Sequence, residues 1–181
     1  MAQWKIDPTH SAAGFSAKHM MVTTVRGEFK NVEGTIGFDP ENPENSWVEA
    51  TIHTDQMSST GVEQRDEHLR SADFLDVQNW PNITFKSTKV DVTGENTAKV
   101  TGDLTIRGVT RPVTLEVEFA GQGVSPYGVT VAGFEGRTKI NREDFGLTWN
   151  VALEAGGWLV GKDINITLDV EAALVTEAET A

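Results

Sequence analysis

The sequence contains no cysteine, and its basic side chains are few beside its acidic ones. Without cysteine the chain can form no disulfide, presents no thiolate nucleophile and has no cysteine-based metal site. Its 15 lysines and arginines stand against 27 aspartates and glutamates, which gives a formal net charge of −12. This charge argues against a nucleic-acid partner and against adsorption to an anionic membrane surface, because both need clustered cations.

The sequence also lacks long apolar runs. No stretch of about 18 apolar residues occurs, so no membrane-spanning helix is expected. The first residues, MAQWKIDPTH, show neither the basic segment nor the apolar run of a signal peptide. A cytoplasmic location is therefore expected for the chain as given, and a periplasmic or secreted one if a signal segment has been removed. No linker or repeat is visible, so we expect one domain over residues 1–174 and an acidic tail over residues 175–181.

Apolar and polar residues alternate with a period of two through most of the chain, which is typical of β-strands with one buried face. In residues 113–119, for example, the apolar positions are Val113, Leu115, Val117 and Phe119. One wet and one dry face per strand indicates antiparallel sheet. Closing a sheet of many strands removes its edges, so we expect an all-β antiparallel barrel of about eight strands rather than a sandwich. Gly34 and Gly37 are expected at bends or bulges.

One charged segment, RDEHLRSADF at residues 65–74, interrupts the strand pattern. Thr60 and Glu63 fit a capping box ahead of it, and acidic residues precede Arg70 at helical spacing. An apolar stripe at the same spacing consists of Val62, Leu69 and Ala72. We therefore expect a short amphipathic helix within residues 60–76 that covers an open end of the barrel, with its charges mostly facing solvent.

The candidate bases and metal ligands are the four histidines, His10, His19, His53 and His68. Their spacing is not that of a zinc motif, so neither a metal site nor a cofactor is expected, although histidines from different strands could still meet in space. An enzyme acting on a hydrophobic substrate, with His19 or His68 as general base, remains an alternative. No nucleophile, base and orienting group can be assembled from the sequence, which disfavours that alternative.

Five segments, in their order along the chain, resemble the signature segments of the YceI-like family: WKIDPTHSAAGFSAKH, GEFKNVEGTIGFD, RDEHLRSADFLDVQNWPNITF, GDLTIRGVTRPVTLEV and INREDFGLTW. The resemblance extends from about Trp4 to about Ala172. It implies an extended lipocalin-like barrel whose apolar tunnel binds a long isoprenoid or a similar amphiphilic lipid. It also implies that the helix within residues 60–76 closes the barrel over the tunnel. Many members of the family carry a secretion signal and are periplasmic, and this chain shows no such signal.

Strand parity predicts which side chains would line such a tunnel, and the helix is expected to contribute two more. The predicted lining residues are Phe15, Ala17, His19, Phe29, Ile36, Phe38, Ile52, Leu69, Phe74, Phe85, Leu104, Ile106, Val117, Phe119 and Phe134. A polar headgroup would seek a cation or a donor at the mouth, for which the candidates are His19, Arg65, His68 and Arg137. A shift of one residue in the strand pairing would move the inward side chains of a strand to its outer face, so each assignment depends on the register.

The function expected from these features is non-catalytic binding of a long-chain isoprenoid or similar amphiphile, for storage, transport or sequestration. Burial of the chain would drive binding, at about 0.8 kcal/mol per methylene-sized unit. A barrel filled by its own side chains, with a structural or interaction role, is the remaining alternative, since it needs the same apolar inward positions. The expected partner is a hydrophobic small molecule, and a homodimer remains open.

Overall fold

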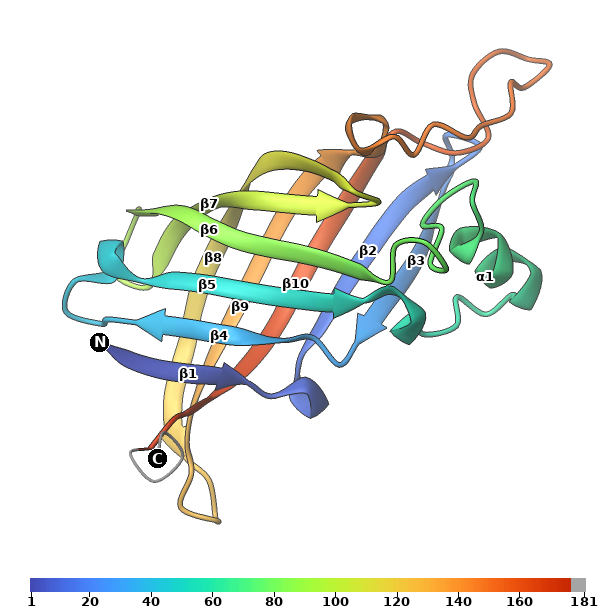
Figure 1. The fold of residues 1–181 in the computed structure, drawn as a ribbon. Coiled ribbons are helices and arrows are strands. Elements are labelled where there is room, and N and C mark those ends of the chain that lie inside the picture. The colour runs from blue at the N-terminus through green and yellow to red at the C-terminus, as the bar shows by residue number, and fades with distance from the viewer. Residues whose placement is uncertain (177–181) are drawn as a thin grey trace.

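The chain folds into an elongated antiparallel β-barrel in a computed structural model that describes residues 1–176 (Figure 1). Its strands are β1 (Ala2–Ile6), β2 (Ala12–His19), β3 (Thr23–Lys30), β4 (Glu33–Phe38), β5 (Trp47–His53), β6 (Asn82–Val92), β7 (Thr97–Ile106), β8 (Val109–Val124), β9 (Thr130–Asn141) and β10 (Asp163–Leu174). Its helical elements are α1 (Glu63–Arg70) and the single 3-10 turns η1 (Pro8–His10), η2 (Pro43–Asn45), η3 (Thr54–Gln56) and η4 (Arg142–Phe145).

Strand β10 closes the barrel because it pairs with three strands. It runs beside β9 along its whole length, and on its other edge it meets first β2 and then β1. The resulting ring of eight strands has the order β1, β4, β5, β6, β7, β8, β9, β10 and back to β1. The β2–β3 hairpin continues the wall beyond the ring. The expected all-β, lipocalin-like barrel of about eight strands is therefore confirmed. Strands β2 and β3 are additional to the eight strands of the ring.

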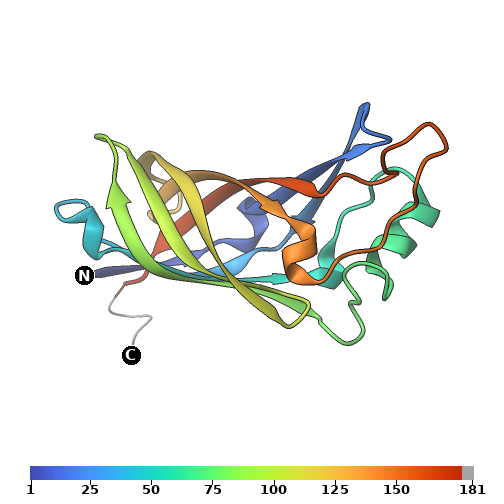
Figure 2. The same ribbon diagram turned by 90° about the horizontal axis from the view of Figure 1, so that it is seen from above.

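The wall is interrupted between β3 and β6, and a segment of non-strand structure fills this place. We call residues 57–81 the covering segment; it contains α1 and the turns that follow it. It is joined to β3 by the bridge between Phe29 and Met57 and by the Ser58 amide, which donates to the Glu28 carbonyl at 2.8 Å. Both views place α1 and the loop 146–162 at the same end of the barrel (Figures 1 and 2).

The strand faces agree with the sequence pattern. In β8, Val113 and Leu115 are buried while Thr114 and Glu116 are exposed. The same alternation holds in β7, where Val100, Gly102, Leu104 and Ile106 are buried. Because the period of a strand is two, one correctly placed apolar residue determines the face of all the others.

Gly34 and Gly37 do not form the expected bulges, since β4 pairs with β1 and β5 without a shift of register. Each glycine instead allows a close approach: a Cβ at Gly34 would collide with the Glu49 carbonyl, and one at Gly37 with the Trp47 indole. The register shifts of the barrel lie elsewhere, between Ser87 and Lys89 in β6 and in the stretch from Phe119 to Gly121 in β8.

The short helix is present where it was expected, but its beginning is built differently. Val62 occupies the N-cap position, is 47% exposed, and provides no side-chain cap, so the predicted capping box is wrong. The buried carboxylate of Asp66 takes over this task by accepting hydrogen bonds from the Ser59 hydroxyl and from the amide and hydroxyl of Thr60. The expectation that the charges mostly face solvent therefore fails at Asp66.

The last described residues lie beside β1. The Val175 amide donates to the Gln3 carbonyl at 2.9 Å, which continues the pairing of β10 with β1. Most of the predicted acidic tail, residues 177–181, lies outside the described residues. Among the helices of residues 1–176, none has the length and apolar character needed to cross a bilayer.

Candidate functional site

The interior of the barrel contains a cavity of about 440 Å³. This volume falls within the range of about 300–1,000 Å³ that is typical of small-molecule sites. Its walls are formed mainly by apolar side chains from β1 to β10 and from the covering segment. A barrel filled by its own side chains would leave no such space, so the cavity disfavours the filled-core alternative.

Most of the predicted lining residues do lie at the cavity wall. Their contact with a ligand stays a prediction. Those at the wall are Phe15, Phe29, Ile36, Phe38, Ile52, Phe74, Phe85, Leu104, Ile106, Val117, Phe119 and Phe134. The remaining three, Ala17, His19 and Leu69, do not line it. The cavity residues of β2 end at Phe15, and His19 lies at the exposed end of that strand. Leu69 packs against the apolar core behind the wall.

The two ends of the cavity differ in exposure. At the α1 end, the lining side chains Phe74, Arg142 and Phe145 are only 6%, 3% and 2% exposed. At the opposite end, the lining includes exposed residues of the β6–β7 turn, such as Glu95 and Asn96. The cavity is therefore closed at the α1 end and opens toward the β6–β7 turn.

Aromatic rings shape the half of the cavity near this opening. Phe38 packs edge-on against Phe134 with ring centroids 5.4 Å apart, and Phe119 lies 5.1 Å from Phe38 and 5.6 Å from Phe134. The three rings come from β4, β8 and β9. Such rings offer a large apolar surface of fixed shape to a chain-like ligand.

The headgroup candidates inferred from the sequence do not meet at the cavity, since none of them lines it. The guanidinium of Arg65 turns back to the hydroxyl and carbonyl of Thr60, at 2.8 and 2.7 Å. Arg137 is exposed on the outer face of β9. Its position follows from parity, because Phe134 points inward and Arg137 lies an odd number of residues away.

His68 lies close to the cavity without lining it. Its ring packs edge-on against Trp149, with centroids 4.5 Å apart, and against Phe74 at 4.9 Å. Its Nε2 lies 2.9 Å from a carboxylate oxygen of Asp73. His68 thus supports Phe74, which is a wall residue, from behind.

Arg142 is a cavity residue that the sequence reasoning missed. It stands in η4, directly after β9, and its side chain is buried at the closed end of the cavity. A signal was present, because Arg142 continues the inward parity of Thr138 and Ile140. Burial lowers the pKa of its guanidinium from the usual value, although an arginine remains charged at neutral pH.

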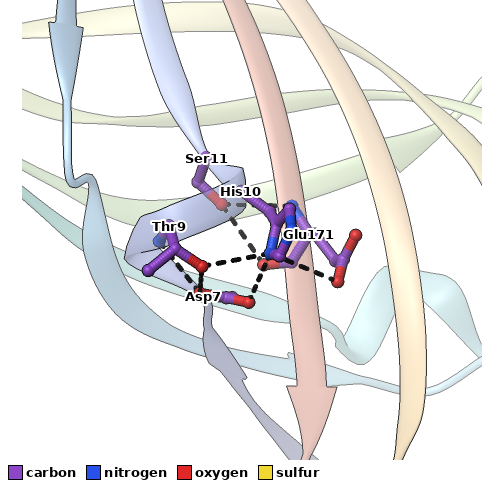
Figure 3. A network of polar contacts seen from close by, with 5 residues as sticks. All are labelled: Asp7, Thr9, His10, Ser11 and Glu171. Atoms are coloured by element: carbon purple, nitrogen blue, oxygen red, sulfur yellow. Dashed lines mark hydrogen bonds and ion pairs between the residues drawn. The ribbon is translucent and has the colours of Figure 1, made fainter. Parts of the chain in front are cut away.

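A cluster of polar residues lies outside the cavity, where β1 gives way to β2 (Figure 3). Ligand atoms of Asp7, His10 and Glu171 all lie within 4.8 Å of one another, a proximity that sequence spacing did not predict. His10 Nδ1 lies 2.8 Å from Asp7, and this hydrogen bond raises the pKa of His10 and lowers that of Asp7. The Ser11 hydroxyl donates to the Glu171 carbonyl and so ties η1 to β10.

The hydrogen bonds of residues 1–176 include no hydroxyl–imidazole–carboxylate relay that would support the enzyme alternative. A hydroxyl–imidazole–carboxylate relay needs its hydroxyl and its carboxylate on opposite nitrogens of the ring. At His10, Thr9 and Asp7 both meet Nδ1, at 3.1 and 2.8 Å. At His68, the nearby Ser71 hydroxyl donates to the backbone carbonyl and not to the ring.

The fold and its cavity define a class of protein, the lipocalin-like barrels with an enclosed apolar space. Comparison with known proteins narrows this class: the model of the YceI-like domain matches residues 4–172. A protein named YceI from Salmonella newport is 43% identical over 149 residues, which are 81% of this chain and 77% of that protein. The chain therefore belongs to the YceI-like family, as its signature segments predicted.

Solved structures agree with this assignment. A YceI protein of Campylobacter jejuni has a TM-score of 0.72 and 31% identity, covering 88% of this chain and 90% of its own. A domain from Saccharophagus degradans, described as polyisoprenoid-binding, has a TM-score of 0.68 and 14% identity over 95% of this chain and 98% of its own. At that identity the second likeness shows the fold alone.

Proposed function

We propose that this protein binds one long-chain amphiphile, with an isoprenoid as the leading class, inside the barrel and performs no reaction on it. The observation that carries the proposal is the cavity of about 440 Å³ with an almost wholly apolar wall. Two further facts support it: the chain belongs to the YceI-like family, and a protein of the same fold is described as polyisoprenoid-binding. Storage, transport or sequestration would each use such a site, and no cofactor besides the ligand is needed.

The driving force would be transfer of the chain out of water. Each buried methylene-sized unit contributes about 0.8 kcal/mol. Association costs about 4–15 kcal/mol in lost translational and rotational freedom. Short chains would therefore bind weakly, and affinity would increase with chain length until the cavity is filled.

A pair of substitutions on neighbouring positions of β7 tests this proposal. Ala98 lines the cavity, whereas the next residue, Lys99, is exposed on the outside. Ala98→Trp should fill the space and weaken binding of a fluorescent long-chain probe by at least about tenfold, which corresponds to roughly 1.4 kcal/mol. Lys99→Trp introduces the same indole outside and should leave the affinity unchanged. Equal affinities of the two folded variants would exclude this cavity as the binding site.

A further inference from the structure

The closed end of the cavity contains a buried positive charge. Among the charged residues that line the cavity, Glu95 and Glu135 are exposed, whereas Arg142 is 3% exposed. The lining side chains of the covering segment and η4 at this end, Phe74 and Phe145, are apolar. An apolar ligand alone would leave this charge without a function in binding.

The guanidinium is held firmly, but only by neutral groups. Its Nε donates to the Gly161 carbonyl at 2.9 Å, and its Nη1 donates to Leu147 and Trp149 at 2.7 and 2.9 Å. Its Nη2 donates to the Val160 carbonyl at 3.2 Å. A guanidinium has five N–H donors, so one donor on Nη2 has no hydrogen-bond acceptor within residues 1–176.

No carboxylate forms an ion pair with Arg142 in the part of the chain that the structure describes. The charge of the neighbouring Glu143 raises the pKa of Arg142 and opposes the larger effect of burial, but the ion pair of Glu143 is with Lys162, at 3.5 Å. The ring of Phe74 lies over the guanidinium, 5.9 Å from its centre, and offers only the weaker attraction of an aromatic face. A buried cation without a counter-ion is unfavourable, so an anion that reached this place would be bound strongly.

We propose that Arg142 receives the anionic head of the bound amphiphile, a carboxylate or a phosphate, at the closed end of the cavity, while the chain extends toward the β6–β7 opening. This inference rests on the proposed function and adds the class and the orientation of the ligand. The four carbonyls fix the guanidinium in place, so its fifth donor is available without rearrangement. The net charge of −12 repels anions in general, so a preference for an anionic head must arise at a local site.

The test compares three ligands with the same chain, hexadecanoate, hexadecyl phosphate and hexadecanol, by displacement of a fluorescent probe. The wild-type protein should bind both anions at least about tenfold more tightly than the alcohol. Arg142→Met should bind all three alike, and Arg142→Lys should keep part of the preference because it keeps the charge. Arg137→Met removes an exposed arginine of β9, the strand that precedes η4, and should behave as wild type.

Each outcome separates this inference from the proposed function. If the wild-type protein binds none of the three ligands and no long-chain isoprenoid alcohol either, the proposed function itself is wrong. If all three bind equally well, the cavity binds chains but Arg142 does not select the head. A tenfold preference that survives in Arg142→Met would also overturn the inference. Should that variant fail to fold, Arg142→Lys decides: a reduced preference for the two anions supports the inference, and an unchanged preference overturns it.

Discussion

Two charged side chains that the fold buries, Asp66 and Arg142, organise the α1 end of the barrel. Asp66 connects α1 with the residues before it, and Arg142 connects η4 with the loop 146–162. The hydrogen bonds from Thr60 and Ser59 lower the pKa of Asp66 from 3.8 to about 2. A carboxyl group whose pKa is lower in the folded state stabilises that state above its unfolded pKa and loses this contribution as the pH falls through the folded pKa.

Asp66→Asn should therefore destabilise the protein near neutral pH, and by less as the solution becomes more acidic. The physical reason is that protonation removes from the wild type, between about pH 4 and pH 2, the same interactions that the substitution removes at every pH. Urea unfolding of both proteins at roughly pH 6 and pH 2.5 measures the difference. Glu67→Gln, at an exposed position of the same helix, is the control and should show no such convergence. A constant difference between wild type and Asp66→Asn would show that its ionisation does not stabilise the fold.

The roles of these two residues could be predicted only in part from the sequence. Arg142 could have been placed inward, because it follows Ile140 by two residues. Its carbonyl partners lie up to 19 residues further along the chain, and no local pattern indicates them. Asp66 stood at a spacing that suggested an ion pair with Arg70, whereas its hydrogen-bond partners precede the helix. Residue spacing predicts which side chains are neighbours on the surface of a helix. It does not predict contacts between the helix and the residues that precede it.

At the scale of elements, the covering segment completes the barrel wall and is joined to the barrel by its own hydrogen bonds. The Arg107 side chain, in the β7–β8 turn, donates to the Phe74 carbonyl at 2.8 Å. Thr54 is hydrogen-bonded to the end of the segment, through its amide to Pro81 and through its hydroxyl to Trp80. Phe74 then contributes its ring to the cavity wall. These anchors hold the closed end of the cavity in place.

Leu69→Ala should destabilise the protein by about 2 kcal/mol, the lower end of the usual range for buried leucines, since Leu69 is only partly buried. Glu67→Ala changes an exposed residue of the same helix and should alter the free energy of unfolding by less than about 0.5 kcal/mol. Chemical denaturation of the ligand-free protein measures both. If Glu67→Ala were the more damaging change, the apolar side of α1 would not be what holds it to the barrel.

The predicted apolar stripe of α1 shows why helices were harder to predict here than strands. Of its members, Val62 and Ala72 are exposed, and only Leu69 packs against the core. A helix of eight residues offers two turns for the pattern to repeat, whereas β8 repeats its alternation over most of 16 residues. The inward faces of the long strands could therefore be inferred from the sequence, and those of the short helix could not.

At the scale of the whole molecule, the elongated barrel combines a closed end and an open end. The closed end is built by the covering segment, η4 and the loop 146–162, and the open end by the β6–β7 turn and the residues before β5 (Figure 2). The apolar clusters of the two halves together form the wall of one continuous cavity. A chain-like molecule fits this shape, because one end can be enclosed while the other remains near solvent.

The central claim is that this cavity holds an amphiphile, and organic extraction of the purified native protein followed by mass spectrometry tests it most directly. The expected result is one class of long-chain amphiphile, close to one molecule per barrel, which is absent from extracts of Ala98→Trp. Protein that carries no lipid should acquire one when long-chain isoprenoids or fatty acids are offered. Native protein without lipid that also fails to take up any long-chain ligand would contradict the claim.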